Sequence, residues 1–283
     1  MAVRIISAVV AIPLLLFFII CGGLPLRAAV LVLSLVGMGE LYKAVSGKFK
    51  AVHFVGFALE VVYAFCMSKI HILGVDDFGF DLYWLLIFFG AIVAAMLAVL
   101  LVLVFRHKTN NIHDGAITIF GFLYVGVLLS LICEIRDCEL AFAWLPFIFA
   151  FGSDTGAYFI GSKFGKNKLC PELSPKKSVE GAVGGVVTVA IMTVIYLLVC
   201  SKMLPSFAEF ASAEGIAVFV VFSVIGAVLS QIGDLAASSI KRFTGIKDYG
   251  KIMPGHGGVL DRFDSVLFTL PVVFAAMVFV IYL

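Results

Sequence analysis

The sequence is dominated by long apolar runs, and one of them, residues 82–105, contains no charged side chain. A run of about 17–25 apolar residues is long enough to cross a bilayer as a helix. Lipid offers no hydrogen-bond partners, so such a segment must pair its backbone groups internally. Composition agrees, because 63% of the 283 residues are hydrophobic, only 13% are charged and the mean hydropathy is +1.16. In a typical soluble domain, roughly a quarter of the residues are charged. We therefore predict an all-α integral membrane protein.

The apolar runs predict a polytopic bundle of about nine transmembrane helices. Their ranges are 4–21, 26–44, 51–68, 82–105, 115–135, 140–161, 179–200, 215–237 and 259–283. A cytoplasmic N-terminus with alternating spans places sixteen of the twenty Lys and Arg residues on the cytoplasmic side, as the positive-inside rule requires. We treat the chain as one continuous membrane unit, with N-terminal transmembrane helices in residues 1–135 and a C-terminal region in residues 136–283 that we expect to hold the chemistry.

Two predicted cytoplasmic loops, residues 162–178 and 238–258, contain nine of those sixteen basic residues together with glycines and prolines. The positive-inside rule and attraction to anionic lipids account for basic residues in other loops. They do not account for lysines that alternate with Ser-Pro and Gly-rich turns. Phosphate sites combine cations with backbone amides at a helix N-terminus, and Ser178 is placed to cap a helix directly after two lysines. The candidate phosphate ligands are Lys176, Lys177, Lys241, Arg242 and Lys247.

Carboxylates lie beside these loops. Asp234 and Lys241 share one helical face with two serines, and Asp261 and Asp264 share a face at the start of the last apolar run. Carboxylates within a membrane are costly and usually face a partner or a water-filled cavity. Three of them in one cavity would repel each other unless a divalent cation lies between them, and Mg²⁺ suits carboxylates beside phosphates.

A simpler interpretation of Asp261 and Asp264 is also open. Both could stabilise a helix N-terminus through the macrodipole, with Arg262 neutralising them. The presence of Asp234 on the neighbouring span and of the glycine-rich "PGHGG" before Asp261 favours the metal site.

Other polar residues in the spans and loops have less certain roles. Asp154 could be a ligand or could hydrogen-bond a neighbouring helix. His256 could contact a phosphate or exchange a proton, or it could be solvated. Glu40 and Glu60 could pair with each other or with His53.

The segment "SSIKRFTGIKDYGKIMPGHGGVLDRFD", residues 238–264, resembles the signature of the phosphatidate cytidylyltransferase (CDP-diacylglycerol synthase) family. That signature reads S-x-φ-K-R, then K-D, then H-G-G-φ-x-D-R-φ-D. One departure is Met253, which stands where Leu, Ile or Phe is usual. Upstream, "SDTGAYFIGSKFGKNKL" and "SPKKSVEGAVGG" are also similar to the family. The resemblance covers about residues 150–265, and the N-terminal spans agree only in being hydrophobic.

The resemblance implies an integral membrane homodimer that converts CTP and phosphatidic acid to CDP-diacylglycerol and pyrophosphate, with Mg²⁺ required, in phospholipid biosynthesis. It implies a location in the cell membrane with the active site on the cytoplasmic side. The metal ligands would be Asp234 and Asp261, with Asp264 close by, and a second, monovalent cation is left open. The expected catalytic residues are Asp234, Asp261, Asp264, Lys241, Arg242 and His256. The expected substrate-binding residues are Ser174, Lys176, Lys177, Ser178, Glu180, Lys247, Asp248, Gly257, Gly258, Arg262 and Asp154.

Two other functions are compatible with parts of the pattern. An ion-coupled transporter would explain carboxylates in the membrane but would give the two basic loops no role. A phosphotransferase that uses a CDP-linked lipid would carry a D-G-x-x-A-R…G-x-x-x-D-x-x-x-D pattern, which this sequence lacks. The sequence therefore favours the cytidylyltransferase.

Overall fold

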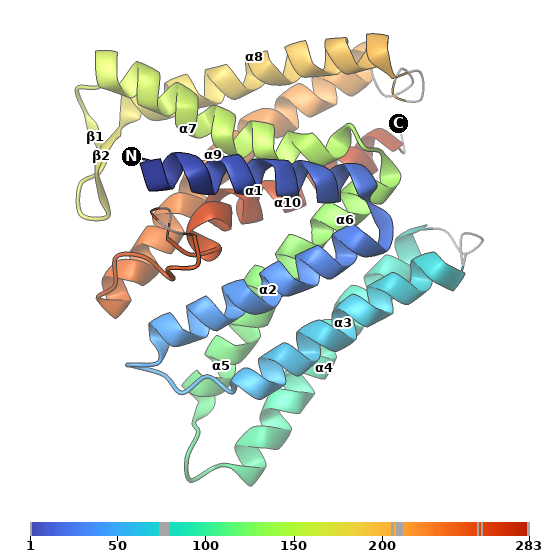
Figure 1. The fold of residues 1–283 in the computed structure, drawn as a ribbon, viewed down its shortest axis with the longest axis vertical. Coiled ribbons are helices and arrows are strands. Elements are labelled where there is room, and N and C mark those ends of the chain that lie inside the picture. The colour runs from blue at the N-terminus through green and yellow to red at the C-terminus, as the bar shows by residue number, and fades with distance from the viewer. Residues whose placement is uncertain are drawn as a thin grey trace. The chain divides into compact units, whose positions relative to one another are not determined.

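The structure is a computed structural model that describes residues 2–73, 80–204, 207, 212–253, 255 and 257–281. Helices make up most of it, so the predicted all-α class is confirmed (Figure 1). Each of the nine predicted ranges overlaps one or more helices, and the chain clusters into two compact units. Unit 1 comprises Met1–Ser130 and Asp248–Leu260, and unit 2 comprises Leu131–Lys247 and Asp261–Leu283.

Unit 1 contains α1 (Ala2–Cys21), α2 (Gly23–Val45), α3 (His53–Leu73), α4 (Phe80–Phe105), α5 (Ile112–Gly121) and the π-helix η1 (Phe122–Val127). Helix α2 packs on α3 and η1, and α3 packs on α4. The fully buried ring of Tyr42 lies against Gly56 and Gly121, where a larger side chain would overlap it. Its hydroxyl donates to the Thr118 carbonyl at 2.8 Å, so small residues and one buried hydrogen bond hold α2, α3 and α5 together.

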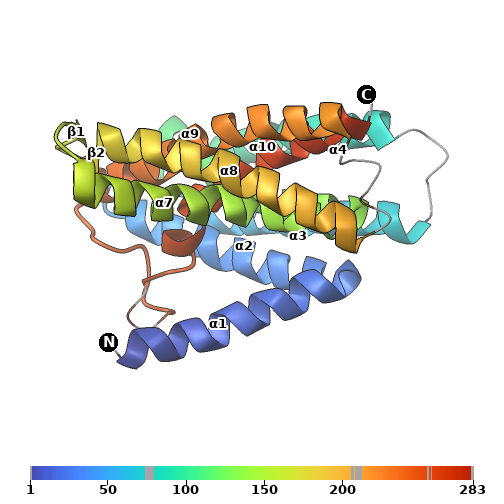
Figure 2. The ribbon, with the colours of Figure 1, turned by 90° about the horizontal axis from the view of Figure 1, so that it is seen from above.

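Unit 2 contains η2 (Phe142–Trp144), α7 (Leu145–Phe164), α8 (Val179–Met203), α9 (Ala213–Thr244) and almost all of α10 (Leu260–Ile281), and α6 (Leu128–Cys138) ends in it. Figure 2 shows α7 and α8 lying along each other. Gly156, Gly181 and Gly184 form their interface, where an added Cβ would meet the facing helix. Close contact of this kind is typical of helices packed in membranes. Gln231 on α9 donates to the Ser153 hydroxyl and the Ala182 carbonyl, which links α9 to both helices.

A two-stranded antiparallel hairpin connects α7 to α8, formed by β1 (Lys168–Cys170) and β2 (Ser174–Ser178). The sequence analysis treated residues 162–178 as a shaped loop and did not predict these strands. Strands of three and five residues are too short to show an alternating pattern, and pairing across the turn forms them instead. The hairpin matters for the site because its second strand leads directly into α8.

Among the described residues, six helical segments are long and apolar enough to cross a membrane. They are Gly23–Val45, Leu86–Phe105, Ile112–Cys138, Val179–Met203, Ala213–Thr244 and Leu260–Ile281. This supports a polytopic integral membrane protein. The nine-span topology and the orientation of the N-terminus stay predictions.

Candidate active site

Helix α9 presents Asp234 and Lys241 along one face, as the sequence predicts. It continues seven residues past the predicted end and stops at Gly245, which has φ 74° and donates its N–H to the Arg242 and Lys241 carbonyls. A left-handed residue at this position is the usual end of a helix and favours glycine. Because of this extension, Lys241 is part of α9 and lies near the start of α10.

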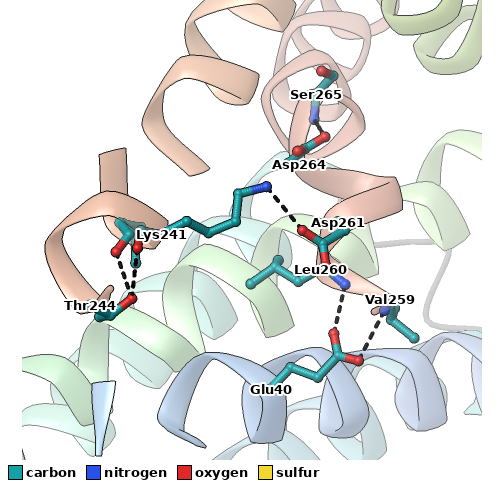
Figure 3. A network of polar contacts seen from close by, with 9 residues as sticks. Glu40, Lys241, Thr244, Val259, Leu260, Asp261, Asp264 and Ser265 are labelled. Carbon is teal, nitrogen blue, oxygen red and sulfur yellow. Dashed lines mark hydrogen bonds and ion pairs between the residues drawn. The ribbon is translucent and has the colours of Figure 1, made fainter. Parts of the chain in front are cut away.

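Lys241 forms an ion pair with Asp261, with Nζ at 2.9 Å from Oδ1 (Figure 3). The Asp261 side chain is only 3% exposed, and a buried carboxylate of this kind is normally paired with a cation. Helices α9 and α10 approach closely at Gly233, where an added Cβ would lie 2.7 Å from the Asp264 carbonyl oxygen and 2.7 Å from the Phe268 ring. Glycine at 233 therefore permits the spacing at which a lysine on α9 reaches an aspartate on α10.

A second ion pair joins the hairpin to α9. Lys177, on β2, places its Nζ 2.5 Å from Oδ2 of Asp234. The next residue, Ser178, caps α8 as predicted, because its hydroxyl accepts the Gly181 N–H at 3.1 Å. The hairpin and the capped helix together fix where Lys177 enters the site.

Asp264 lies one turn after Asp261 and is buried. Its carboxylate accepts the N–H of the next residue, Ser265, at 2.8 Å (Figure 3). The charges of Asp234 and Asp154 act repulsively on Asp264, and that of Lys241 acts attractively. Asp154 also interacts with Lys177 and Asp234, although it is exposed on α7. Unit 2 thus contains four carboxyl groups and two ammonium groups in this region, so acidic side chains outnumber their lysine partners.

These carboxylates fit the donor chemistry of Mg²⁺, which prefers hard oxygen ligands. Within the described part of the chain, no group of three His, Cys, Asp or Glu side chains stands at coordinating distance. Two of the three predicted ligands are held by lysines instead. The predicted metal ligation by Asp234, Asp261 and Asp264 stays a prediction.

The remaining predicted residues fall into three groups. Lys176, Arg242, Lys247, Asp248 and Arg262 are exposed. The second group, Ser174, Glu180, Gly257 and Gly258, makes contacts within the protein, and its role in substrate binding stays a prediction. Ser174 pairs with Cys170 in the hairpin, and Glu180 accepts the backbone N–H groups of Lys166 and Asn167. Gly257 exchanges two backbone hydrogen bonds with Met253. His256 lies outside the described residues.

Glu40 has a role that the sequence analysis missed. Its carboxylate accepts the Val259 N–H at 3.1 Å and the Leu260 N–H at 2.9 Å, at the start of α10 (Figure 3). It is only 6% exposed, and Gly250 and Gly258 lie against it where any side chain would overlap the carboxylate. Glu40 therefore caps the first turn of α10 from another helix, next to Asp261 in the chain.

The suggested pairing of Glu40 with Glu60 or His53 stays a prediction beside this cap, and the His53 ring stacks on Tyr42 with centroids 5.2 Å apart. Because the partners of Glu40 lie 219 and 220 residues away, no local spacing could have indicated them. The only signal in the sequence was a carboxylate inside an apolar run.

Long apolar helices define a polytopic helical membrane protein, and its unit 2 holds two lysine–aspartate ion pairs. Comparison with known proteins names the family. Residues 2–280 match the model of the cytidylyltransferase family. The chain is 32% identical over 277 residues to phosphatidate cytidylyltransferase of Bacillus subtilis, covering 95% of this chain and 94% of that protein. It is 31% identical over 271 residues to the enzyme of Staphylococcus saprophyticus, with 96% of each chain covered.

The chain therefore belongs to the cytidylyltransferase family and is a nucleotidyltransferase. The resemblance drawn from residues 238–264 is confirmed, and it extends well beyond residues 150–265, because the family match begins at residue 2. The transporter alternative gains no support from these comparisons.

Proposed function

We propose that this chain transfers the cytidylyl group of CTP to phosphatidic acid and forms CDP-diacylglycerol and pyrophosphate. The relatives that carry the name phosphatidate cytidylyltransferase align over nearly the whole chain. The structural observation that carries the proposal is the double ion pair in unit 2, Lys177 with Asp234 and Lys241 with Asp261. It combines the cations that phosphates require with the carboxylates that a metal requires.

The reaction needs no nucleophile from the protein. An oxygen of the lipid phosphate attacks the α-phosphorus of CTP and forms the new P–O bond. The bond from that phosphorus to the bridging oxygen breaks, and pyrophosphate leaves with the electron pair. The protein must align the two phosphates and neutralise their charge.

Lys177 and Lys241 are the residues that we assign to charge neutralisation. Each ammonium group is partly buried and forms an ion pair with a carboxylate. A phosphate oxygen can replace that carboxylate as the partner, because both are anionic acceptors. Such an exchange would release Asp234 and Asp261 while keeping both lysines paired.

We further propose that Asp234, Asp261 and Asp264 hold Mg²⁺. When bound, the ion would supply neutralisation of phosphoryl oxygens. The excess of carboxylates over ammonium groups in unit 2 supports this proposal. The buried position of Asp264, whose carboxylate accepts the Ser265 N–H, supports it as well.

The finer topology belongs to the same proposal. We infer a cell-membrane enzyme with a cytoplasmic N-terminus and an active site on the cytoplasmic side, where CTP arrives from water and the lipid from the bilayer. The excess of basic residues on that side supports the orientation. A homodimer follows from the family resemblance alone.

The function is tested with the purified full-length chain, labelled CTP and Mg²⁺. Phosphatidic acid should give a labelled lipid, whereas diacylglycerol should give none, because it lacks the attacking phosphate. A chelator should stop the reaction. Labelling of diacylglycerol, or ion-driven uptake in vesicles without any labelled lipid, would refute the proposal.

A further inference from the structure

Unit 1 contains a wide, open cavity of about 840 Å³ at its surface, and none of the predicted site residues lines it. Two connections form it, the one between α2 and α3 and the one between α4 and α5, which reach the same end of this unit (Figure 1). Its lining residues are 50–54 and 105–110. Its volume lies in the range of small-ligand pockets, about 300–1,000 Å³.

The lining is cationic. Lys50, Arg106 and Lys108 contribute three positive charges, and His53 and His107 contribute two imidazoles. Among the described residues that line the cavity, none is acidic. The carboxylate behind its wall, Asp114, is buried and already accepts the backbone N–H groups of Lys50 and Asn111. The lining of the cavity therefore carries an excess of positive charge, on side chains that are exposed.

Hydrogen bonds between the two connections fix its walls. The Asn110 side chain donates to the Lys50 carbonyl at 3.0 Å, and the Lys50 N–H donates to Asp114 at 2.7 Å. The Val52 N–H donates to the Thr118 hydroxyl at 2.8 Å. A ligand would enter a preformed site, so it would not have to order these loops.

The rim of the cavity is apolar. Phe54 is 81% exposed and Phe105 is 77% exposed, and both line the cavity beside the cations. Free phosphate would gain nothing from contact with exposed aromatic rings. A phospholipid does, because its phosphate pairs with cations while its acyl chains cover apolar surface.

We propose that this cavity binds the phosphate of an anionic phospholipid, with Lys50, Arg106 and Lys108 as its ligands and the two phenylalanines against the lipid tails. The positive-inside rule explains basic residues in these connections. It does not explain why residues from two connections, more than 50 positions apart, converge on one cavity with an apolar rim.

The test uses the purified full-length chain and two double variants that each remove two positive charges. R106Q/K108Q removes charge from the cavity. K43Q/K48Q removes the same charge from exposed lysines near the end of α2 that do not line it. Bound dioleoyl phosphatidylglycerol and dioleoyl phosphatidylcholine are counted by native mass spectrometry, with inorganic phosphate as competitor.

We expect phosphatidylglycerol to be retained over phosphatidylcholine and R106Q/K108Q to weaken its binding about 25-fold, because each basic residue near a lipid surface contributes on the order of fivefold. K43Q/K48Q should bind like the wild type. If both variants weakened phosphatidylglycerol binding equally, general surface charge would explain the binding and the proposal would be overturned. Displacement by inorganic phosphate at equal concentration, or equal retention of phosphatidylcholine, would also overturn it.

Discussion

Because Glu40 caps α10, we can predict how much removing its side chain lowers the free energy of unfolding. Glu40→Ala leaves the Val259 and Leu260 N–H groups without their carboxylate acceptor in a buried place. Each buried N–H left unsatisfied costs about 1–3 kcal/mol, so we expect a loss of about 3 kcal/mol. For a chain of this size that is roughly 6–12 °C in Tm. Glu40→Gln keeps one oxygen acceptor and should lose about half as much.

The measurement is thermal unfolding of purified protein in one detergent, with turnover of CTP recorded in parallel. Glu214→Gln is the matched control, because it removes an acidic side chain from the first turn of α9 that is exposed. This control should unfold like the wild type. A Glu40→Ala protein with unchanged Tm would refute the claim that the carboxylate supports the start of α10.

Three further predictions concern unit 2. Asp261→Asn should reduce turnover by at least about 10²-fold, since it removes a carboxylate that we propose to hold Mg²⁺ at the reacting phosphates; normal turnover would contradict its assignment. It should also lower Tm, because the partly buried Lys241 loses this ion-pair partner. Lys177→Gln should lower kcat/KM for CTP by about 10–100-fold, because it removes a charge-assisted contact. The control is Lys168→Gln, which changes an exposed lysine on β1 and should leave kcat/KM unchanged. Equal effects of the two variants would show that only the general surface charge matters. Gly233→Ala should lower the free energy of unfolding by about 1–3 kcal/mol, because the added Cβ overlaps the α10 backbone. The control Gly90→Ala places its Cβ in open space and should leave Tm unchanged or slightly raised.

The helical ranges could be predicted because the apolar runs are long and are bounded by glycine, proline or charge. Residues 179–200 and 82–105 differ from α8 and α4 by only a few positions at either end. The end of α9 was placed too early, because "SSIKRFT" is polar and was read as loop. There the lysine at position 241 pairs with an aspartate on α10, so tertiary contact extends the helix past the apolar pattern.

The site could be predicted in its residue types and in part of its pairing. Helical spacing placed Asp234 and Lys241 on one face, and the structure shows that each pairs with a residue from another element. Their partners could not be read from the sequence, because Lys177 is delivered by a hairpin whose strands are too short to recognise. The role of Glu40 could not be predicted for a related reason, since a residue that caps a helix far away in the chain has no characteristic spacing from it in the sequence.

The most direct test of the proposed chemistry is the fate of two labels in CTP. The purified chain is given phosphatidic acid, Mg²⁺ and CTP labelled at the α- or the γ-phosphorus. Attack of the lipid phosphate on the α-phosphorus predicts that the α-label appears in the lipid and the γ-label in pyrophosphate, in equal amounts. Transfer of the γ-label to the lipid, or a folded protein that moves neither label, would contradict the account.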